Sequence, residues 1–171
     1  MIVYRDEMID EEAAAAIADD VVLLLQACTA TFGDRVLERV REEAGESVRF
    51  NDGYVFQHLV PGPIAISVLA RRLGVTQQAA SKQVLDLEGR DLVRRRADPA
   101  DGRGTLVELS RRGRRAVEAG RTARRELADE ITAVLGPRRA AALVRALADV
   151  SAHTGAVERM AARRLRPESD R

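Results

Sequence analysis

The sequence of 171 residues contains little of several residue types, and each shortage argues against a class of protein. There is no tryptophan, and aromatic residues make up only 3% of the chain, which argues against binding single-stranded nucleic acid by stacking bases on aromatic rings. A single cysteine, Cys28, excludes an intramolecular disulfide and a cysteine-based metal cluster. Neither histidine has a His or carboxylate partner at ligand spacing, so we expect no metal site.

The patterns of an enzyme and of an export signal are also missing. No paired catalytic constellation and no glycine-rich phosphate loop after a strand is present, so we expect neither an enzyme nor a cofactor. Met1–Asp10 has no basic segment and no long apolar run, which predicts no signal peptide or membrane span and hence a cytoplasmic protein. At 46% hydrophobic and 32% charged residues, residues 1–171 are expected to form a single domain with a real core.

Lysine is nearly absent, since Lys82 is the only one in the chain. Together with the abundant alanine, this is typical of the coding bias of a GC-rich genome, so the number of arginines says little about function. Their distribution says more. Residues 71–125 hold 15 basic against 7 acidic side chains, whereas residues 1–70 hold 5 against 13. The basic excess is therefore concentrated in one segment, as phosphate binding requires.

That segment opens with the pattern of a helix-turn-helix. A first helix is expected at about Ser67–Leu73, and Gly74 follows it at a position that favours a left-handed conformation. Thr76 is a suitable N-cap for a second helix from Gln77 to about Glu88.

The second helix has two contrasting sides. Apolar residues recur at i, i+4 and i+7 and predict a buried stripe of Ala80, Val84 and Leu87. The other side carries polar side chains near the helix N-terminus, the part of a recognition helix that reaches base edges in the major groove. These candidate DNA-binding residues are Thr76, Gln77, Gln78, Ser81 and Lys82.

An arginine-rich hairpin is expected next. Leu92–Val93 begins a strand that continues through Arg94, Arg95 and Arg96, and Thr105–Leu109 supplies the returning strand. The intervening DPADGRG is a turn by composition. A short hairpin of this kind directly after a helix-turn-helix is a wing. We expect Arg103 at its tip to enter a minor groove, with Asp101 holding the guanidinium in place.

The segment LARRLGVTQQAASKQVLDLEGRDLVRRRADPADGRGTLVELSRRG resembles the winged helix-turn-helix of the MarR family of bacterial transcriptional regulators. The features that match are LA..LG.T in the helix-turn-helix, LE..DLV.R at its exit, DP.DGR in the wing and.V.LS..G at the start of the following helix. The match covers about residues 64–115, and the flanking helices agree in kind and order.

Helices are expected on both sides of this segment. A long helical region spans about Asp6 to Gly45, with a potential break near Phe32–Asp34, and a short helix at Tyr54–Val60 precedes a minimal strand at Ile64–Ile66. Ser110 N-caps a helix that runs to about Leu135, and its first turns place basic residues near the DNA backbone: Arg111, Arg112, Arg114 and Arg115. Pro137 then starts a last helix that extends beyond Val157.

The resemblance implies a mainly α (α+β) fold, a winged helix-turn-helix at residues 54–115 with long dimerisation helices at residues 1–45 and 116–165. It further implies a homodimer that binds double-stranded DNA, by its recognition helix in the major groove and by its wing in the minor groove. The expected function is sequence-specific transcriptional regulation, by default repression, on a palindromic operator. A small-molecule effector is expected in the seam near Tyr54 and His58.

Alternatives stay open at this point. Cys28 lies on an apolar helix face and is expected to be a small buried hydrophobe, although peroxide-sensing members of the family carry a cysteine in the N-terminal helix. His58 and His153 are expected at a helix surface or a domain seam. A winged helix can also serve protein–protein contact, but such a module has no need for Arg103 beside Asp101 or for polar Gln77, Gln78 and Ser81 on one face.

Overall fold

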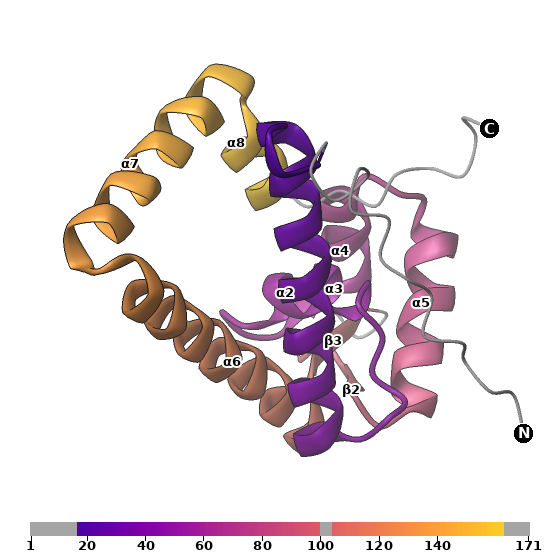
Figure 1. Ribbon diagram of the computed structural model, residues 1–171. Helices are drawn as coiled ribbons and strands as arrows, with labels where there is room; N and C mark the ends of the chain where they lie inside the picture. The colour runs from indigo at the N-terminus through magenta and orange to yellow at the C-terminus, as the bar shows by residue number, and fades with distance from the viewer. Residues whose placement is uncertain (1–16, 100–103, 163–171) are drawn as a thin grey trace, which may run out of the picture. The chain divides into compact units, whose positions relative to one another are not determined.

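The computed structural model describes residues 17–99 and 104–162 of the chain (Figure 1). The chain divides into two compact units, Met1–Arg35 and Val36–Arg171. The elements are α2 (Val21–Ala44), α3 (Asp52–Leu59), β1 (Ile64–Ala65), α4 (Ile66–Leu73), α5 (Gln77–Gly89), β2 (Val93–Ala97), β3 (Thr105–Leu109), α6 (Arg111–Leu135), α7 (Pro137–Thr154) and α8 (Ala156–Ala162).

The helix α2 begins at a capping aspartate. The Asp20 carboxylate accepts hydrogen bonds from the backbone N–H groups of Val22, at 2.7 Å, and Leu23, at 3.1 Å, which satisfies donors that a helix start leaves unpaired. The expected break near Phe32–Asp34 is wrong, because α2 runs through Gly33 without interruption. The interruption lies at Asp19–Asp20 instead.

The expectation that Cys28 is buried is also wrong. Cys28 is exposed on α2, and its apolar neighbours Leu24 and Leu25 are 41% and 39% exposed in the single chain. A helix forms here as the apolar period predicts, but the period does not say whether the apolar face is covered within one chain.

The core lies in the second unit, where the winged helix is built around fully buried aliphatic side chains. Leu69 and Leu73 of α4 pack with Val84 and Leu87 of α5, and all four are 0% exposed. The expected buried stripe of α5 is therefore confirmed, including Ala80. Further buried members of this core come from α3, the residue before β2, the sheet and the first turns of α6: Val55, Leu59, Leu92, Val93, Val107 and Ala116.

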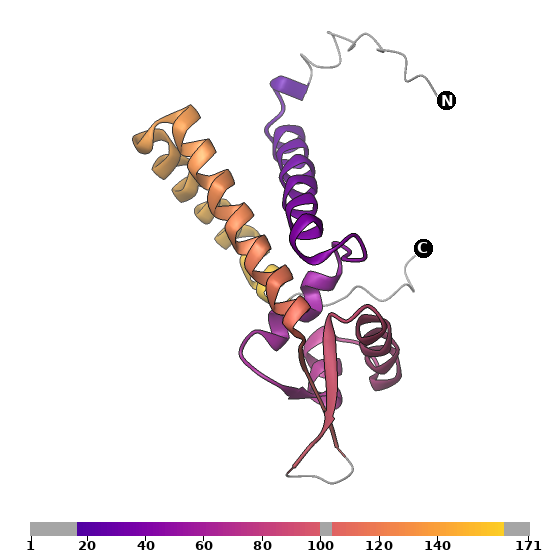
Figure 2. The same ribbon diagram turned by 90° about the horizontal axis from the view of Figure 1, so that it is seen from below.

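A small antiparallel sheet with strand order β1-β3-β2 forms the wing and its base. β2 and β3 pair from Val93 with Leu109 to Ala97 with Thr105. The expected minimal strand is confirmed, since Ile64 and Ala65 pair with Val107 and Leu106 of β3. Figure 2 shows β2 and β3 running out together past the helices of the winged helix.

The helix α6 starts against the base of this sheet. Ser110 caps it as expected, because its Oγ accepts the backbone N–H of Gly113 at 2.9 Å. The same Oγ donates to the carbonyl of Asp91 at 2.6 Å, so one hydroxyl joins the helix start to the turn before β2. A Cβ on Gly113 would lie 2.0 Å from the Leu92 carbonyl oxygen, so only glycine allows this approach.

The C-terminal helices differ from the single helix that was expected. α6 ends at Leu135 and Pro137 occupies the first turn of α7, as predicted. However, α7 ends at Thr154, the C-cap Gly155 has a left-handed φ of +63°, and α8 follows as a separate helix. A glycine at this position terminates a helix readily.

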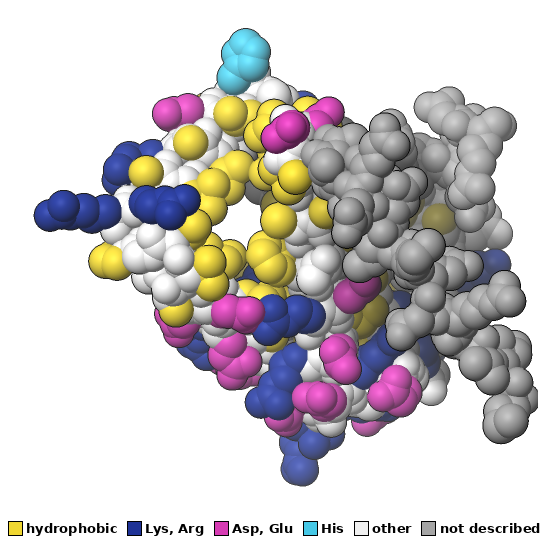
Figure 3. Space-filling view, in the orientation of Figure 1, with side chains coloured by type: hydrophobic (Ala, Val, Ile, Leu, Met, Phe, Trp, Pro, Cys, Tyr) yellow, Lys and Arg dark blue, Asp and Glu magenta, His cyan; other side chains and the backbone are white. Residues whose placement is uncertain are grey.

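The helix α7 buries none of its residues, and apolar side chains appear on its surface in Figure 3. Exposed apolar residues of α7 and α8 include Val144, Leu147, Val150, Val157 and Met160. Within residues 17–99 and 104–162, no helix is both long enough and apolar enough to cross a membrane.

Candidate nucleic-acid interface

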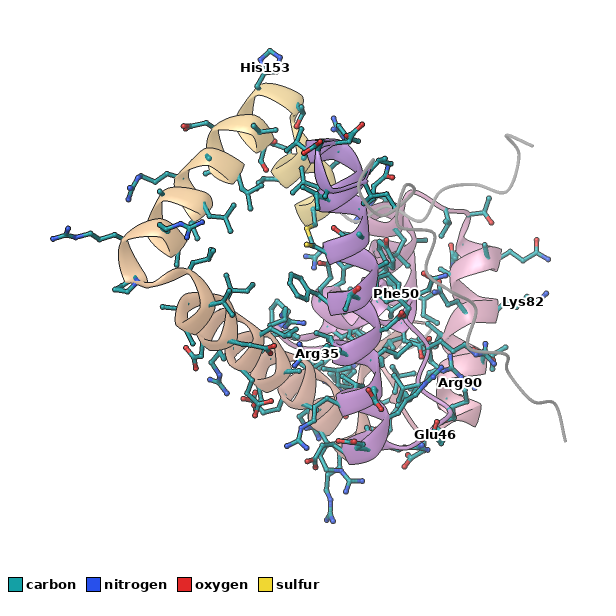
Figure 4. The ribbon with its side chains drawn as sticks, viewed as in Figure 1. Arg35, Glu46, Phe50, Lys82, Arg90 and His153 are labelled. Atoms are coloured by element: carbon teal, nitrogen blue, oxygen red, sulfur yellow. The ribbon has the colours of Figure 1, made fainter. Side chains whose placement is uncertain are left out.

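The N-terminal turns of α5 present polar side chains to solvent while the opposite side is buried. Gln77, Gln78 and Lys82 are exposed and Ser81 is partly exposed, and Figure 4 shows Lys82 pointing away from the rest of the winged helix. These side chains offer amide, hydroxyl and ammonium groups, which are the groups that read base edges in a major groove. All four lie where the sequence placed them, on one accessible side.

Thr76 has a defined structural task. Its Oγ1 accepts the backbone N–H of Ala79 at 3.1 Å, so it N-caps α5 as predicted. The preceding turn is set by Gly74, which has a φ of +70° and donates its N–H to the end of α4. The helix-turn-helix geometry thus follows from a cap and a glycine that the sequence reveals.

Two basic residues beside this turn were missed by the sequence analysis. Arg71 and Arg72 are exposed at the C-terminal end of α4, close in the chain to the start of α5. The sequence could have revealed them, because two consecutive arginines follow the apolar Leu69 and Ala70, and two such charges are expected on the side of the helix away from the core. A first helix that crosses the DNA backbone would bring such side chains to phosphates.

The three arginines of β2 divide between the two faces of the hairpin. Arg94 lies 3.2 Å and Arg96 3.9 Å from carboxylate oxygens of Glu108. Arg95 lies on the other face, and its Nε donates to Glu88 at the end of α5 at 2.6 Å. Each candidate phosphate ligand of this strand therefore already has an acidic neighbour, which the sequence analysis did not anticipate.

The two residues expected at the wing tip, Asp101 and Arg103, lie outside the described residues. The pairing of β2 with β3 does extend to Ala97 and Thr105, immediately before and after the tip segment. The interpretation of Arg103 as a minor-groove residue stays a prediction from the sequence.

The arginines at the start of α6 have different environments, and the expectation that they face the DNA backbone is wrong for Arg112. Arg111 and Arg115 are exposed. Arg112 instead turns inward: its guanidinium donates to the Ala44 carbonyl, to the Arg90 carbonyl at 2.9 Å and to Ser47 Oγ at 3.0 Å. Arg114 donates to the Leu109 carbonyl at 2.7 Å but stays exposed.

Arg90, directly after α5, was also missed. Its guanidinium makes a two-point contact with Asp52 of α3, at 2.6 and 2.9 Å, and reaches Asp86 at 2.6 Å. Hydrogen bonding to Asp52 raises the pKa of Arg90 above its ordinary value. Nothing in the sequence distinguishes this arginine from its neighbours, because its main partner lies 38 residues earlier.

The residues expected near an effector lie on α3. Tyr54 packs against the core cluster. His58 is partly exposed, and its Nε2 lies 3.3 Å from Gln57 Nε2. His153 lies exposed at the end of α7 (Figure 4). The described residues contain no group of three or more side chains suited to hold a metal ion.

Residues 52–104 match the MarR family, from the start of α3 to the residue before β3. No curated protein matches the chain significantly. Among solved structures, the RV1404 protein from Mycobacterium tuberculosis is 25% identical, with a TM-score of 0.66 over 88% of this chain and 97% of the other.

Some of the similar structures contain DNA. The MepR–DNA complex of S. aureus has a TM-score of 0.64 at 18% identity, over 78% of this chain and 97% of the other. Streptococcus pneumoniae FabT in complex with DNA has a TM-score of 0.61 at 16% identity, over 81% of this chain and 99% of the other. At these identities the likeness shows a shared fold.

Proposed function

We propose that the protein is a sequence-specific DNA-binding transcriptional regulator. The premise is that its winged helix-turn-helix is that of the MarR family. The observation that carries the proposal is the accessible polar side of α5, with Gln77, Gln78 and Lys82 exposed over a fully buried stripe. Such a helix can enter a major groove without disturbing the core.

The DNA complexes of MepR and FabT support double-stranded DNA as the partner, because proteins of the same fold bind it. In this proposal α5 reads bases in the major groove and the wing, through Arg103, occupies the adjacent minor groove. Arg111, Arg94 and Arg96 contact phosphates. Arg94 and Arg96 can do so only if their ion pairs with Glu108 loosen. Arg95, held by Glu88, supports the wing.

The acting form is a homodimer on a palindromic operator. Exposed apolar side chains on α7 and α8, such as Val144 at 67% and Met160 at 63%, support this assembly, because a single chain leaves a surface that association would remove from water. The helices within residues 1–45 and 116–165 would form the interface, and residues 54–115 would bind DNA. A two-fold protein places two recognition helices on two half-sites, about one turn of DNA apart.

Repression, relieved by a small molecule bound near Tyr54 and His58, completes the proposed function. The support for an effector is the family match together with the place of both residues on α3, which packs directly on α4 of the helix-turn-helix. A compound that displaces α3 would move the DNA-binding helices.

Selection of bound duplexes from a random DNA pool tests the core of the proposal. The expected result is an enriched palindrome, with protein and DNA in a 2:1 ratio. Recovery of random sequences with no shared site would contradict sequence-specific binding. It would favour the other use of this fold, protein–protein contact.

A redox-responsive regulator is the second candidate, favoured by the exposure of Cys28 in the single chain. An accessible thiol can be oxidised, whereas a buried one is protected. In this case peroxide treatment lowers the affinity of the protein for its selected site, and Cys28→Ser abolishes that response. An equal response in both proteins would exclude Cys28 as the sensor.

A further inference from the structure

The C-terminal end of α5 is held by two arginines that bond to three different parts of the second unit. We call Arg90 and Arg112, with their partners Ala44, Ser47 and Asp52, the arginine joint. The joint lies away from the base-reading side of the helix: in Figure 4, Arg90 reaches from the end of α5 toward the rest of the winged helix, whereas Lys82 points away from it.

Arg90 forms the first half of the joint. Both of its terminal nitrogens donate to the Asp52 carboxylate, a two-point geometry that fixes distance and angle together. One of them also donates to the Ser47 carbonyl at 2.8 Å. The Arg90 side chain is 12% and the Asp52 side chain 6% exposed, so water competes little for these bonds.

Arg112 forms the second half. Its three nitrogens donate to the carbonyl of Ala44 at the end of α2, to the carbonyl of Arg90 and to the hydroxyl of Ser47. The start of α6 is thereby tied to the backbone that follows α5. α2 ends at Ala44 and α6 begins at Arg111. The Arg112 side chain therefore connects the end of α2 and the start of α6 to Arg90, the residue that follows the recognition helix.

Apolar packing alone does not define the position of α5 to the same degree. Its buried side consists of Ala80, Val84 and Leu87, and the burial of apolar side chains is non-directional. A two-point ion pair adds a directional contact at the C-terminal end of the helix. A small rotation of α5 about that end would displace the base-reading side chains at its N-terminal end.

We propose that Arg90 is a positioning residue for DNA recognition: through Asp52 and Arg112 it sets the angle at which α5 meets the DNA and couples that angle to the ends of α2 and α6. This inference rests on the proposed function. It concerns residues that touch no base and no phosphate.

The test compares full-length Arg90→Lys and Asp52→Asn proteins with the unaltered protein on the selected duplex, at several salt concentrations. Lysine keeps the charge but lacks the planar fork needed to bond Asp52 at two points and Asp86 as well. Arg49→Gln is the matched control, because Arg49 also pairs with Asp86, at 3.4 Å, but its side chain is 63% exposed and it does not bond Arg90.

The joint predicts that Arg90→Lys and Asp52→Asn each weaken binding to the selected duplex by about tenfold, while the double variant adds little, because both changes break the same contact. Binding to unrelated DNA and the slope of log K against log salt stay as in the unaltered protein. A residue that bound a phosphate directly would lower that slope by about 1. An unchanged affinity in folded Arg90→Lys, a reduced slope, or the same tenfold loss in Arg49→Gln would overturn the proposal.

Hydrogen exchange of the free proteins gives a second readout that does not depend on DNA. The joint predicts faster amide exchange in α5 and in residues 45–51 of Arg90→Lys, with the β2–β3 pairing unaffected. Uniform acceleration throughout the second unit would show that Arg90 only stabilises the fold. If the unaltered protein bound no DNA, the proposed function would fail, and this exchange pattern would still decide whether the joint holds α5.

Discussion

The Nε of Arg95 lies 2.6 Å from a carboxylate oxygen of Glu88, so the first strand of the wing is tied to the last turn of the recognition helix. The side chains are 39% and 33% exposed, and the Arg95 N–H also donates to Glu88 at 3.3 Å. In the proposed function, this contact helps to position the wing relative to the recognition helix α5.

Glu88→Gln should therefore affect DNA binding more than stability. A partly exposed ion pair contributes about 0.2–1 kcal/mol to folding, so the unfolding midpoint should change little. Loss of the tie should weaken binding to the selected duplex even though the change removes a negative charge, which simple electrostatics predicts to tighten binding. Titration of the duplex at one fixed salt concentration distinguishes weaker from tighter binding. Tighter binding by Glu88→Gln would exclude the positioning role.

Gly113 allows α6 to start against the base of the sheet. Because a Cβ there would lie 2.0 Å from the backbone oxygen of Leu92, Gly113→Ala must displace the helix or the strand. We expect a loss of about 1–3 kcal/mol in the free energy of unfolding, as for other overpacked core positions, measured by urea denaturation.

Gly89→Ala is the matched control, since nothing lies within 4 Å of a Cβ at the last residue of α5. It should be neutral or stabilise the protein by up to about 1 kcal/mol. Similar losses in both variants would mean that the close approach at Gly113 is not the cause.

Local sequence signals predicted the framework of the winged helix well. Thr76 and Ser110 cap helices, Gly74 ends one and Pro137 starts one, each through atoms within a few residues of itself. Such contacts are readable because the chain brings the partners together without help from the fold.

Contacts between distant segments were not predictable. Arg112 was expected near DNA, yet it bonds Ala44, 68 residues away, and Arg90 depends in the same way on Asp52. An arginine in a basic segment has the same appearance whether it faces phosphate or a buried carbonyl. Cys28 shows that burial is equally hard to predict for an apolar helix face, because it depends on which distant surface covers the helix.

The wing tip is predicted from the sequence alone, since Asp101 and Arg103 lie outside the described residues. Arg103→Ala should lose much of the DNA affinity and leave folding intact. Asp101→Ala should also weaken binding, because a carboxylate that orients Arg103 helps more than its charge repels phosphate. Titration of both variants against one duplex at fixed salt checks this, and tighter binding by Asp101→Ala would refute the pairing.

In the proposed function α5 reads bases, and substitution of the exposed Gln78 tests this role. A glutamine amide can pair with adenine at two points, so Gln78→Ala should reduce discrimination at one base pair of each half-site by about 1–3 kcal/mol. Affinities for a set of duplexes with single base-pair changes measure it. Equal weakening on every duplex would instead assign Gln78 to the DNA backbone.

The most direct measurement compares the affinity of the unaltered protein for its selected palindromic duplex with that for an unrelated duplex of equal length, both at physiological salt. Sequence-specific recognition by the polar side of α5 predicts a ratio of at least about 10³. Equal affinity for the two duplexes would contradict the account, because contacts between basic residues and phosphates do not distinguish one sequence from another.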